Sequence, residues 1–138
     1  EAAVRELLDV AVAQGLVEAV LAAKDDGRTP LHLAAYFGKE AIVRELLDVA
    51  VAQGLVEAVL GAKASGGYTA LHWAAREGKE ATVKALLDAA AQVANTDAIL
   101  KAQNNDGKTA LDVAEEKERK ASGEELTRYQ AIIQMLRA

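Results

Sequence analysis

Hydrophobic residues recur along the chain every three or four positions, which is the spacing of helices that are buried on one face. Between Gly38 and Gly54, hydrophobic residues recur at helical spacing, and charged residues occupy several of the positions between them. Those hydrophobic positions are Ile42, Val43, Leu46, Leu47, Val49 and Ala50. A shorter helix is predicted just before this one, because Thr29 can cap a first turn and Pro30 fits the first helical position. The pattern therefore predicts pairs of helices, each with one apolar face that needs a neighbour.

The helix pair returns at a fixed interval. Thr29, Thr69 and Thr109 lie 40 residues apart, and a glycine stands two positions before each of them. The segments that begin at these threonines read TPLHLAA, TALHWAA and TALDVA, and Gly-Lys-Glu appears shortly after the first two. A fixed period of this length is typical of a repeat architecture, in which adjacent units cover each other's apolar faces.

The three segments resemble the ankyrin repeat, whose signature begins with Thr-Pro-Leu-His. The resemblance covers most of the chain and implies an all-α fold, an ankyrin-type helical solenoid of stacked repeats. HEAT-like repeats have a similar period, but the recurrent Thr-x-Leu-His turn argues against them. The ankyrin period is about 33 residues, so a period of 40 leaves about seven additional residues in each unit. They follow the second helix, where we interpret residues 55–60 as a short third helix, with a β-strand as the competing interpretation.

A chain of 138 residues is long enough for one domain with a continuous core. The repeat boundaries divide that domain into an N-terminal half repeat at 1–24, repeats at 25–63 and 64–103, and a C-terminal capping repeat at 104–138. In the last unit, strongly polar residues precede Ile132, Ile133 and Leu136, and a polar outer face is what a terminal cap requires.

The N-terminal half repeat is nearly a copy of an internal segment. Residues 1–24 and 40–63 are identical at 22 of 24 positions. Natural neighbouring repeats are seldom that similar, so we expect an engineered or idealised chain. An internal unit is apolar on two sides because it has a neighbour on each. The residues of the first unit that we expect to be uncovered are Val4, Leu7, Leu8 and Val12, and either a second copy of the chain or a preceding helix could cover them.

Composition narrows the classes of partner. The formal net charge is −5, the pI is near 5.1 and no stripe of Lys and Arg is present, so nucleic acid is not an expected partner. No hydrophobic run is long enough to cross a bilayer, and the first residues do not resemble a signal peptide, so we expect no membrane partner. Cysteine is absent, which excludes disulfides and thiolate metal sites and suits a cytoplasmic location if the chain is natural.

Candidate catalytic and metal-binding residues are few. His32 and His72 are the only histidines, and the family resemblance implies that each belongs to the hydrogen-bond network of its turn. Gly107-Lys108-Thr109 is similar to the end of a phosphate-binding loop, but Ala102 stands where that loop needs a glycine. Asn104-Asn105-Asp106-Gly107 lacks the later acidic ligands of a calcium loop and fits a turn instead. We therefore expect no enzyme activity, no metal and no cofactor.

A surface remains as the candidate for function. The resemblance implies a concave groove of turn tips and first helices, at positions that are commonly varied in designed ankyrin binders. The residues at these positions are Arg28, Tyr36, Phe37, Tyr68, Trp73, Arg76, Glu77 and Lys108. Large aromatic residues and arginine are common at interface hot spots, although Trp73 fits equally well a role in packing between repeats.

The predicted function is that of a non-catalytic protein-interaction or scaffold module, which binds a protein partner through this groove. A chain made to test a backbone would have no partner. The alternative function is a homo-oligomer that assembles through the N-terminal repeat face.

Overall fold

A computed structural model describes residues 28–93 and 95–137 of the chain. Its helices are α3 (Pro30–Phe37), α4 (Glu40–Gln53), α5 (Val56–Gly61), the 3-10 helix η1 (Ser65–Gly67), α6 (Ala70–Arg76), α7 (Glu80–Ala90), α8 (Thr96–Leu100), α9 (Ala110–Lys120) and α10 (Gly123–Arg137). These elements confirm the predicted all-α class. The half repeat predicted at 1–24 lies outside the described residues.

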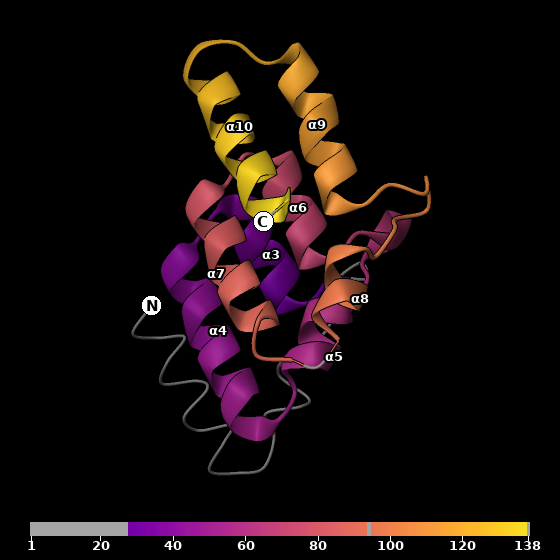
Figure 1. The fold of residues 1–138 in the computed structure, drawn as a ribbon. Coiled ribbons are helices and arrows are strands. Elements are labelled where there is room, and N and C mark those ends of the chain that lie inside the picture. The colour runs from indigo at the N-terminus through magenta and orange to yellow at the C-terminus, as the bar shows by residue number, and fades with distance from the viewer. Residues whose placement is uncertain (1–27, 94, 138) are drawn as a thin grey trace.

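The helices stack in three rows (Figure 1). The first row holds α3, α6 and α9, and the second row holds α4, α7 and α10; successive helices of each row pack against each other. Within a repeat, the first helix packs against the second, as α3 does on α4 and α6 on α7. The short helices α5 and α8 contact each other and form the third row. This stacking is the predicted helical solenoid, and it lines up the turns and first helices along one side.

Each helix of the first row begins at a capping threonine. The Oγ1 atoms of Thr29, Thr69 and Thr109 accept a hydrogen bond from the backbone N–H three residues later, at 3.3, 3.3 and 3.2 Å. Pro30 occupies the first turn of α3, where its missing N–H leaves no helical bond unmade. The predicted helix starts are therefore confirmed.

The additional residues of the 40-residue repeat form the third helix. α4 ends at Gln53, because Gly54 adopts a left-handed conformation with φ 70° and its N–H bonds back to the last carbonyls. α5 then begins at Val56, so the predicted third helix is confirmed and the β-strand interpretation is wrong. Val56, Val59 and Leu60 are spaced to share one face of α5, and all three are buried. This helix packs against α4 and α7.

The core is built from the same positions in successive repeats. Leu31 and Leu71 of the first row are 1% and 3% exposed, and Val43 and Val83 of the second row are fully buried. Burial of a Leu or Val side chain stabilises a fold by about 1.5–3 kcal/mol. Because each of these residues lies between neighbouring helices, the repeats stabilise one another.

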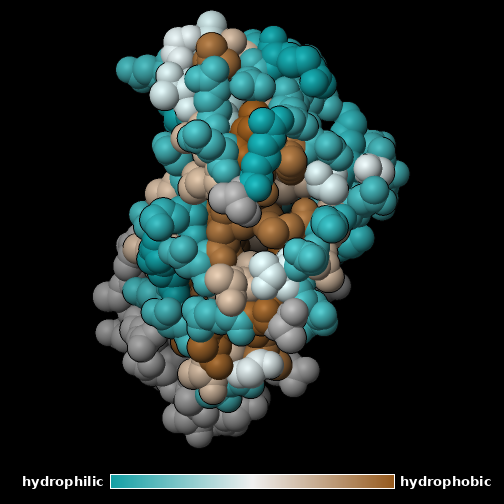
Figure 2. Space-filling view, in the orientation of Figure 1, coloured by the Kyte–Doolittle hydropathy of each residue, from teal (hydrophilic) through white to brown (hydrophobic). Residues whose placement is uncertain are grey.

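The last helix pair combines a buried face with a polar cover. Ile132, Ile133 and Leu136 are buried on α10, the helix that packs against α7 and α9. Figure 2 shows hydrophilic atoms over most of α9 and α10, and hydrophobic atoms gathered along the middle of this face, between α7 and α8. A polar cover of this kind is what a terminal unit of a repeat array needs.

Candidate protein-interaction surface

The turn before each first-row helix is held by hydrogen bonds that the repeat histidine completes. His72 Nδ1 accepts a bond from the backbone N–H of Thr69 at 3.2 Å and lies 2.8 Å from the Thr69 hydroxyl. A ring whose Nδ1 is an acceptor carries its proton on Nε2. The Nε2–H therefore donates to the carbonyl oxygen of Lys108, which is 2.8 Å away. His72 thus joins its own helix cap to the next repeat.

His32 makes equivalent contacts one repeat earlier. Its Nδ1 lies 3.1 Å from the backbone nitrogen and 2.8 Å from the hydroxyl of Thr29, and its Nε2 lies 2.9 Å from the carbonyl oxygen of Ala62. For His72, burial lowers the pKa, and the hydrogen bond to the Lys108 carbonyl offsets part of that effect. Both nitrogens of each ring are engaged, which confirms that the histidines belong to the turn network.

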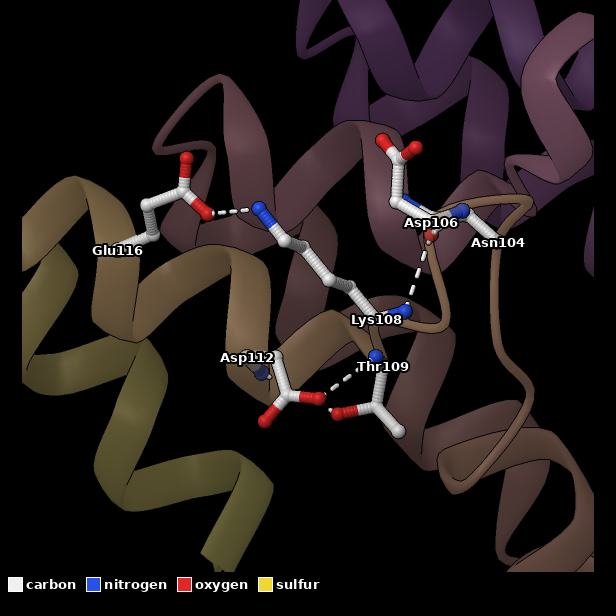
Figure 3. A network of polar contacts seen from close by, with 6 residues as sticks. All are labelled: Asn104, Asp106, Lys108, Thr109, Asp112 and Glu116. Carbon is white, nitrogen blue, oxygen red and sulfur yellow. Dashed lines mark hydrogen bonds and ion pairs between the residues drawn. The ribbon is translucent and has the colours of Figure 1, made fainter.

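The third repeat keeps the turn but has no histidine (Figure 3). Asp112 stands in its place, and its Oδ2 accepts a bond from the N–H of Thr109 at 3.0 Å. Asn104 Oδ1 accepts bonds from the N–H groups of Asp106 and Lys108, at 2.9 and 3.0 Å. The Asn/Asp-rich segment is therefore a turn, as predicted.

Four aromatic rings and one guanidinium group lie together on α3, α6 and the turn before α6. We call Tyr36, Phe37, Tyr68, Trp73 and Arg76 the aromatic cluster. The Tyr36 ring contacts those of Phe37 and Trp73 edge to face, with centroids 5.0 and 5.4 Å apart. The Tyr68 ring lies 4.7 Å from that of Trp73. Arg76 Cζ lies 5.9 Å from the Tyr68 centroid and 5.4 Å from the Trp73 centroid, within the range of cation–π contacts.

The residues of the aromatic cluster on α3 are exposed to solvent, and its other two rings are half-buried. Phe37 is 60% exposed and Tyr36 is 39% exposed, whereas Tyr68 and Trp73 are half-buried. Trp73 also packs against the core, so it contributes to the contact between repeats as well as to the surface. Its buried Nε1 has no hydrogen-bond partner among the described residues.

Two adjoining hollows lie along the first row. The first has a volume of about 470 Å³ and is lined by Arg28, His32, Leu33, Tyr36, Phe37, Trp73 and Arg76. The second has a volume of about 200 Å³ and is lined by Tyr68, Arg76, Asp106, Lys108, Val113, Glu116 and Lys117. Arg76 borders both hollows, so together they form one surface across α3, α6 and α9, which we call the groove.

The charged residues of the groove differ in how they are paired. Lys108 Nζ pairs with the Glu116 carboxylate, which raises the pKa of Lys108 and lowers the pKa of Glu116 (Figure 3). Arg76 Nε lies 3.8 Å from the carboxylate of Glu77, which is beyond hydrogen-bond length. Tyr129, the one aromatic residue outside the cluster, donates a 2.7 Å bond from α10 to the Arg76 carbonyl and so holds the end of α6.

The structure brings seven of the eight predicted surface residues into the groove. They are Arg28, Tyr36, Phe37, Tyr68, Trp73, Arg76 and Lys108, and the exception is Glu77. Sequence reasoning did not place His32, Leu33, Asp106, Val113, Glu116 and Lys117 in the groove. Leu33 and Val113 could have been found by alignment of the repeats, because both occupy the position of Trp73. The role of these residues in binding remains a prediction.

The residues predicted to mediate self-association lie outside the described residues. They are Val4, Leu7, Leu8 and Val12. Within residues 28–93 and 95–137, no helix combines the length and the hydrophobicity needed to span a bilayer. Over the same ranges, no three His, Cys, Asp or Glu side chains are grouped as metal ligands would be.

Comparison with known proteins identifies similar sequences and folds. A family model described as ankyrin repeats (3 copies) matches residues 1–97 and 47–134. No curated protein matches the chain. Among solved structures, the ankyrin repeat domain of Bcl-3, described as a unique member of the IkappaB protein family, is 26% identical to this chain. That alignment covers 81% of this chain and spans 57% of the Bcl-3 chain, with a TM-score of 0.42.

Proposed function

The chain belongs to the ankyrin-repeat family, and from this premise we propose that its groove binds a protein partner by surface contact, without catalysis. Ankyrin repeats generally mediate interactions between proteins. One observation about this chain carries the proposal: within residues 28–37 and their equivalents in the next two repeats, the positions that hold three different residues line the groove.

Four positions between the turn and the end of the first helix hold a different residue in each of the three repeats. They are occupied by Arg28, Tyr68 and Lys108; by Leu33, Trp73 and Val113; by Tyr36, Arg76 and Glu116; and by Phe37, Glu77 and Lys117. Eleven of these twelve residues line the groove, and the exception is Glu77. Among the described residues, the groove takes only His32 and Asp106 from other positions.

The positions that stay constant have a structural explanation. The capping threonine, the leucine two residues later and an alanine on the same helix are identical in all three repeats. Leu31, Leu71 and the corresponding alanines are buried, so stacking of the repeats requires them. Solvent-exposed positions vary more freely, but exposed hydrophobic residues that gather in one patch are typical of an interaction site. The varied positions here include Tyr36, Phe37 and Trp73, which are residue types that interfaces favour.

A photo-crosslinking amino acid tests the proposal. Benzoylphenylalanine replaces Phe37, which is 60% exposed in the groove, and in a matched control it replaces Val51, which is 39% exposed on α4. Each protein is irradiated in a lysate of the cells that express the chain. We expect adducts of discrete mass from position 37 and none from position 51, because only the first position faces the groove.

Competition decides whether the adducts are specific. Excess unlabelled wild-type chain should remove the adducts at position 37, whereas excess chain carrying Arg76→Glu should not. Equal adducts at both positions, or equal competition by the two unlabelled chains, would contradict binding through the groove.

The alternative function, self-assembly through the N-terminal repeat face, is supported by the near-identity of residues 1–24 and 40–63. The same near-identity supports an engineered origin. Native mass spectrometry tests self-assembly. An oligomer that Leu8→Glu converts to a helical monomer would favour it, and a wild-type chain that stays monomeric at high concentration would rule it out.

A further inference from the structure

We propose that the groove selects a protein segment in which a large hydrophobic side chain lies beside one or more carboxylates. The inference rests on the proposed function and adds the chemistry of the partner. Two features carry it: an aromatic-walled hollow next to α3, and an excess of cationic side chains along the groove.

The hydrophobic side chain of the partner enters the first hollow, between Leu33, Tyr36, Phe37 and Trp73. A volume of about 470 Å³ has room for an aromatic or branched aliphatic side chain. Phe37 is 60% exposed in the free chain, and its burial against the partner removes apolar surface from water. The edge-to-face contacts of Tyr36 with Phe37 and Trp73 hold this wall in place, so little ordering is needed on binding.

The charges along the groove are predominantly positive. Its cationic side chains are those of Arg28, Arg76, Lys108 and Lys117. Its carboxylates among the described residues are Asp106 and Glu116, both in the second hollow, and Glu116 is already paired with Lys108. Among the described residues, only cations contribute formal charge to the lining of the first hollow. The chain as a whole carries −5, so the groove is a positive region on a negative protein.

Arg76 is the residue that places a carboxylate next to the hydrophobic side chain. Its Cζ atom lies 5.9 Å from the centroid of the Tyr68 ring and 5.4 Å from that of the Trp73 ring. An arginine in such a cation–π contact can still donate two N–H bonds to one carboxylate. The one ion pair of Arg76 in the described residues is with Glu77, and the 3.8 Å between Nε and the carboxylate oxygen is too long for a hydrogen bond. Because Arg76 borders both hollows, a carboxylate bound there lies directly beside the first hollow.

Aromatic side chains that stack on bases, together with cationic side chains that contact phosphates, can also bind single-stranded nucleic acid. A phosphate backbone carries a charge at every nucleotide, and it would meet the two groove carboxylates as well as the net charge of −5. A protein segment with one or two carboxylates meets less of this repulsion. We therefore assign the groove to an acidic protein segment, and nucleic acid becomes an outcome of the test.

Selection from a library of randomised peptides on phage, against the folded full chain, tests the inference. Enriched peptides without tryptophan are synthesised and titrated, and the emission of Trp73, the only tryptophan of the chain, reports binding at the groove. We expect the peptides to combine Asp or Glu with a neighbouring Phe, Leu or Ile. Their affinity should fall as the salt concentration rises, because a charge contact at an exposed groove is screened.

Two charge reversals of equal size separate the groove from the net charge. The side chains of Arg76 and Arg44 are 41% and 43% exposed, and Arg44 lies on α4 in the second row. Arg76→Glu should lower the affinity about tenfold or more, whereas Arg44→Glu should leave it unchanged. Circular dichroism checks that each variant is folded.

The possible results distinguish this inference from the proposed function. Peptides that bind at the groove but lack carboxylates, or that carry basic residues, would overturn the partner chemistry and leave the proposed function standing. Peptides that bind equally well to a Phe37→Glu chain would overturn both, since position 37 is an exposed part of the groove and accepts glutamate in the next repeat. Failure to enrich any peptide would also overturn the inference, as would tight binding of oligothymidylate that Arg76→Glu abolishes.

Discussion

Replacement of His72 by asparagine separates the two hydrogen-bonding roles of this side chain. An amide oxygen there can accept the N–H of Thr69, as the carboxylate of Asp112 accepts the N–H of Thr109 in the next repeat. The amide is too short to reach the carbonyl of Lys108, to which the imidazole Nε2–H donates at 2.8 Å. His72→Asn therefore keeps the helix cap and removes the bridge between repeats.

The expected loss of stability follows from the burial of this site. His72 is 1% exposed, so water cannot replace the lost bridge, which contributes about 1 kcal/mol. The Lys108 carbonyl keeps a bond of 2.9 Å from the N–H of Asn104 and is not left unpaired. The smaller side chain leaves unfilled space, which costs about 1 kcal/mol more. We expect a loss of about 2 kcal/mol for His72→Asn, and about 4 kcal/mol for His72→Ala, which also strips the buried Thr69 N–H of its partner.

Urea denaturation of the three proteins at about pH 7.5 and about pH 5.5 measures these losses and their pH dependence. Burial lowers the pKa of His72 in the folded chain, so below about pH 6.5 the unfolded chain binds a proton more readily than the folded chain does. Wild-type stability therefore falls on acidification, and His72→Asn lacks that contribution while it retains His32. The gap between wild type and His72→Asn should narrow at the lower pH. A gap that widens, or His72→Asn as costly as His72→Ala, would refute the assignment of the two roles.

Four further substitutions test the packing in denaturation experiments. Leu47→Ala should cost about 2–5 kcal/mol, because Leu47 is 4% exposed in the middle of α4; a loss below about 1 kcal/mol would contradict its place in the core. Tyr129→Phe should cost about 1 kcal/mol, since it removes only the 2.7 Å bond to the Arg76 carbonyl; no measurable change would show that water replaces this bond. Gly78→Ala should lower the melting temperature more than Gly54→Ala does. Their φ angles are 68° and 70°, but only at Gly78 does an added Cβ meet a ring, that of Tyr129 at 3.3 Å, and equal effects would count against this contact.

The fold could be predicted largely from local signals, because each repeat carries its own start and stop residues. Thr29 and Pro30 mark the first helix, and Gly54 ends the second, in each case through bonds within a few residues. The additional residues of the 40-residue period predicted an element at 55–60 and left helix and strand open, and the structure shows the helix Val56–Gly61. In a solenoid, each element packs mainly on adjacent elements, so local prediction and a repeat period suffice to give the architecture.

The groove was predicted only in part, because residue type alone does not distinguish its aliphatic members from residues of the core. Aromatic residues make up 4% of the chain, so their grouping on turns and first helices was informative. Leu33 and Val113 were missed, since an aliphatic residue on a helix has the same pattern whether it faces the core or a groove. Glu77 holds the position of Phe37, yet its carboxylate pairs with Arg76 and does not reach the hollow. Leu33 and Val113 share the repeat position of Trp73 and could have been found by alignment, whereas the pairing of Glu77 with Arg76 does not follow from position in the repeat.

Trp73 connects the stability of the array to its surface. Phe37 is 60% exposed and contributes little to stacking, whereas the caps and buried leucines hold the repeats together. Trp73 contributes to both the stacking and the groove, because it packs on the core and also lies at the centre of the aromatic cluster. Leu33 fills the equivalent position one repeat earlier, so stacking alone does not require a ring there. Since this ring also leaves an indole N–H buried without a partner in the described chain, its presence is better explained by the surface that it forms than by the fold.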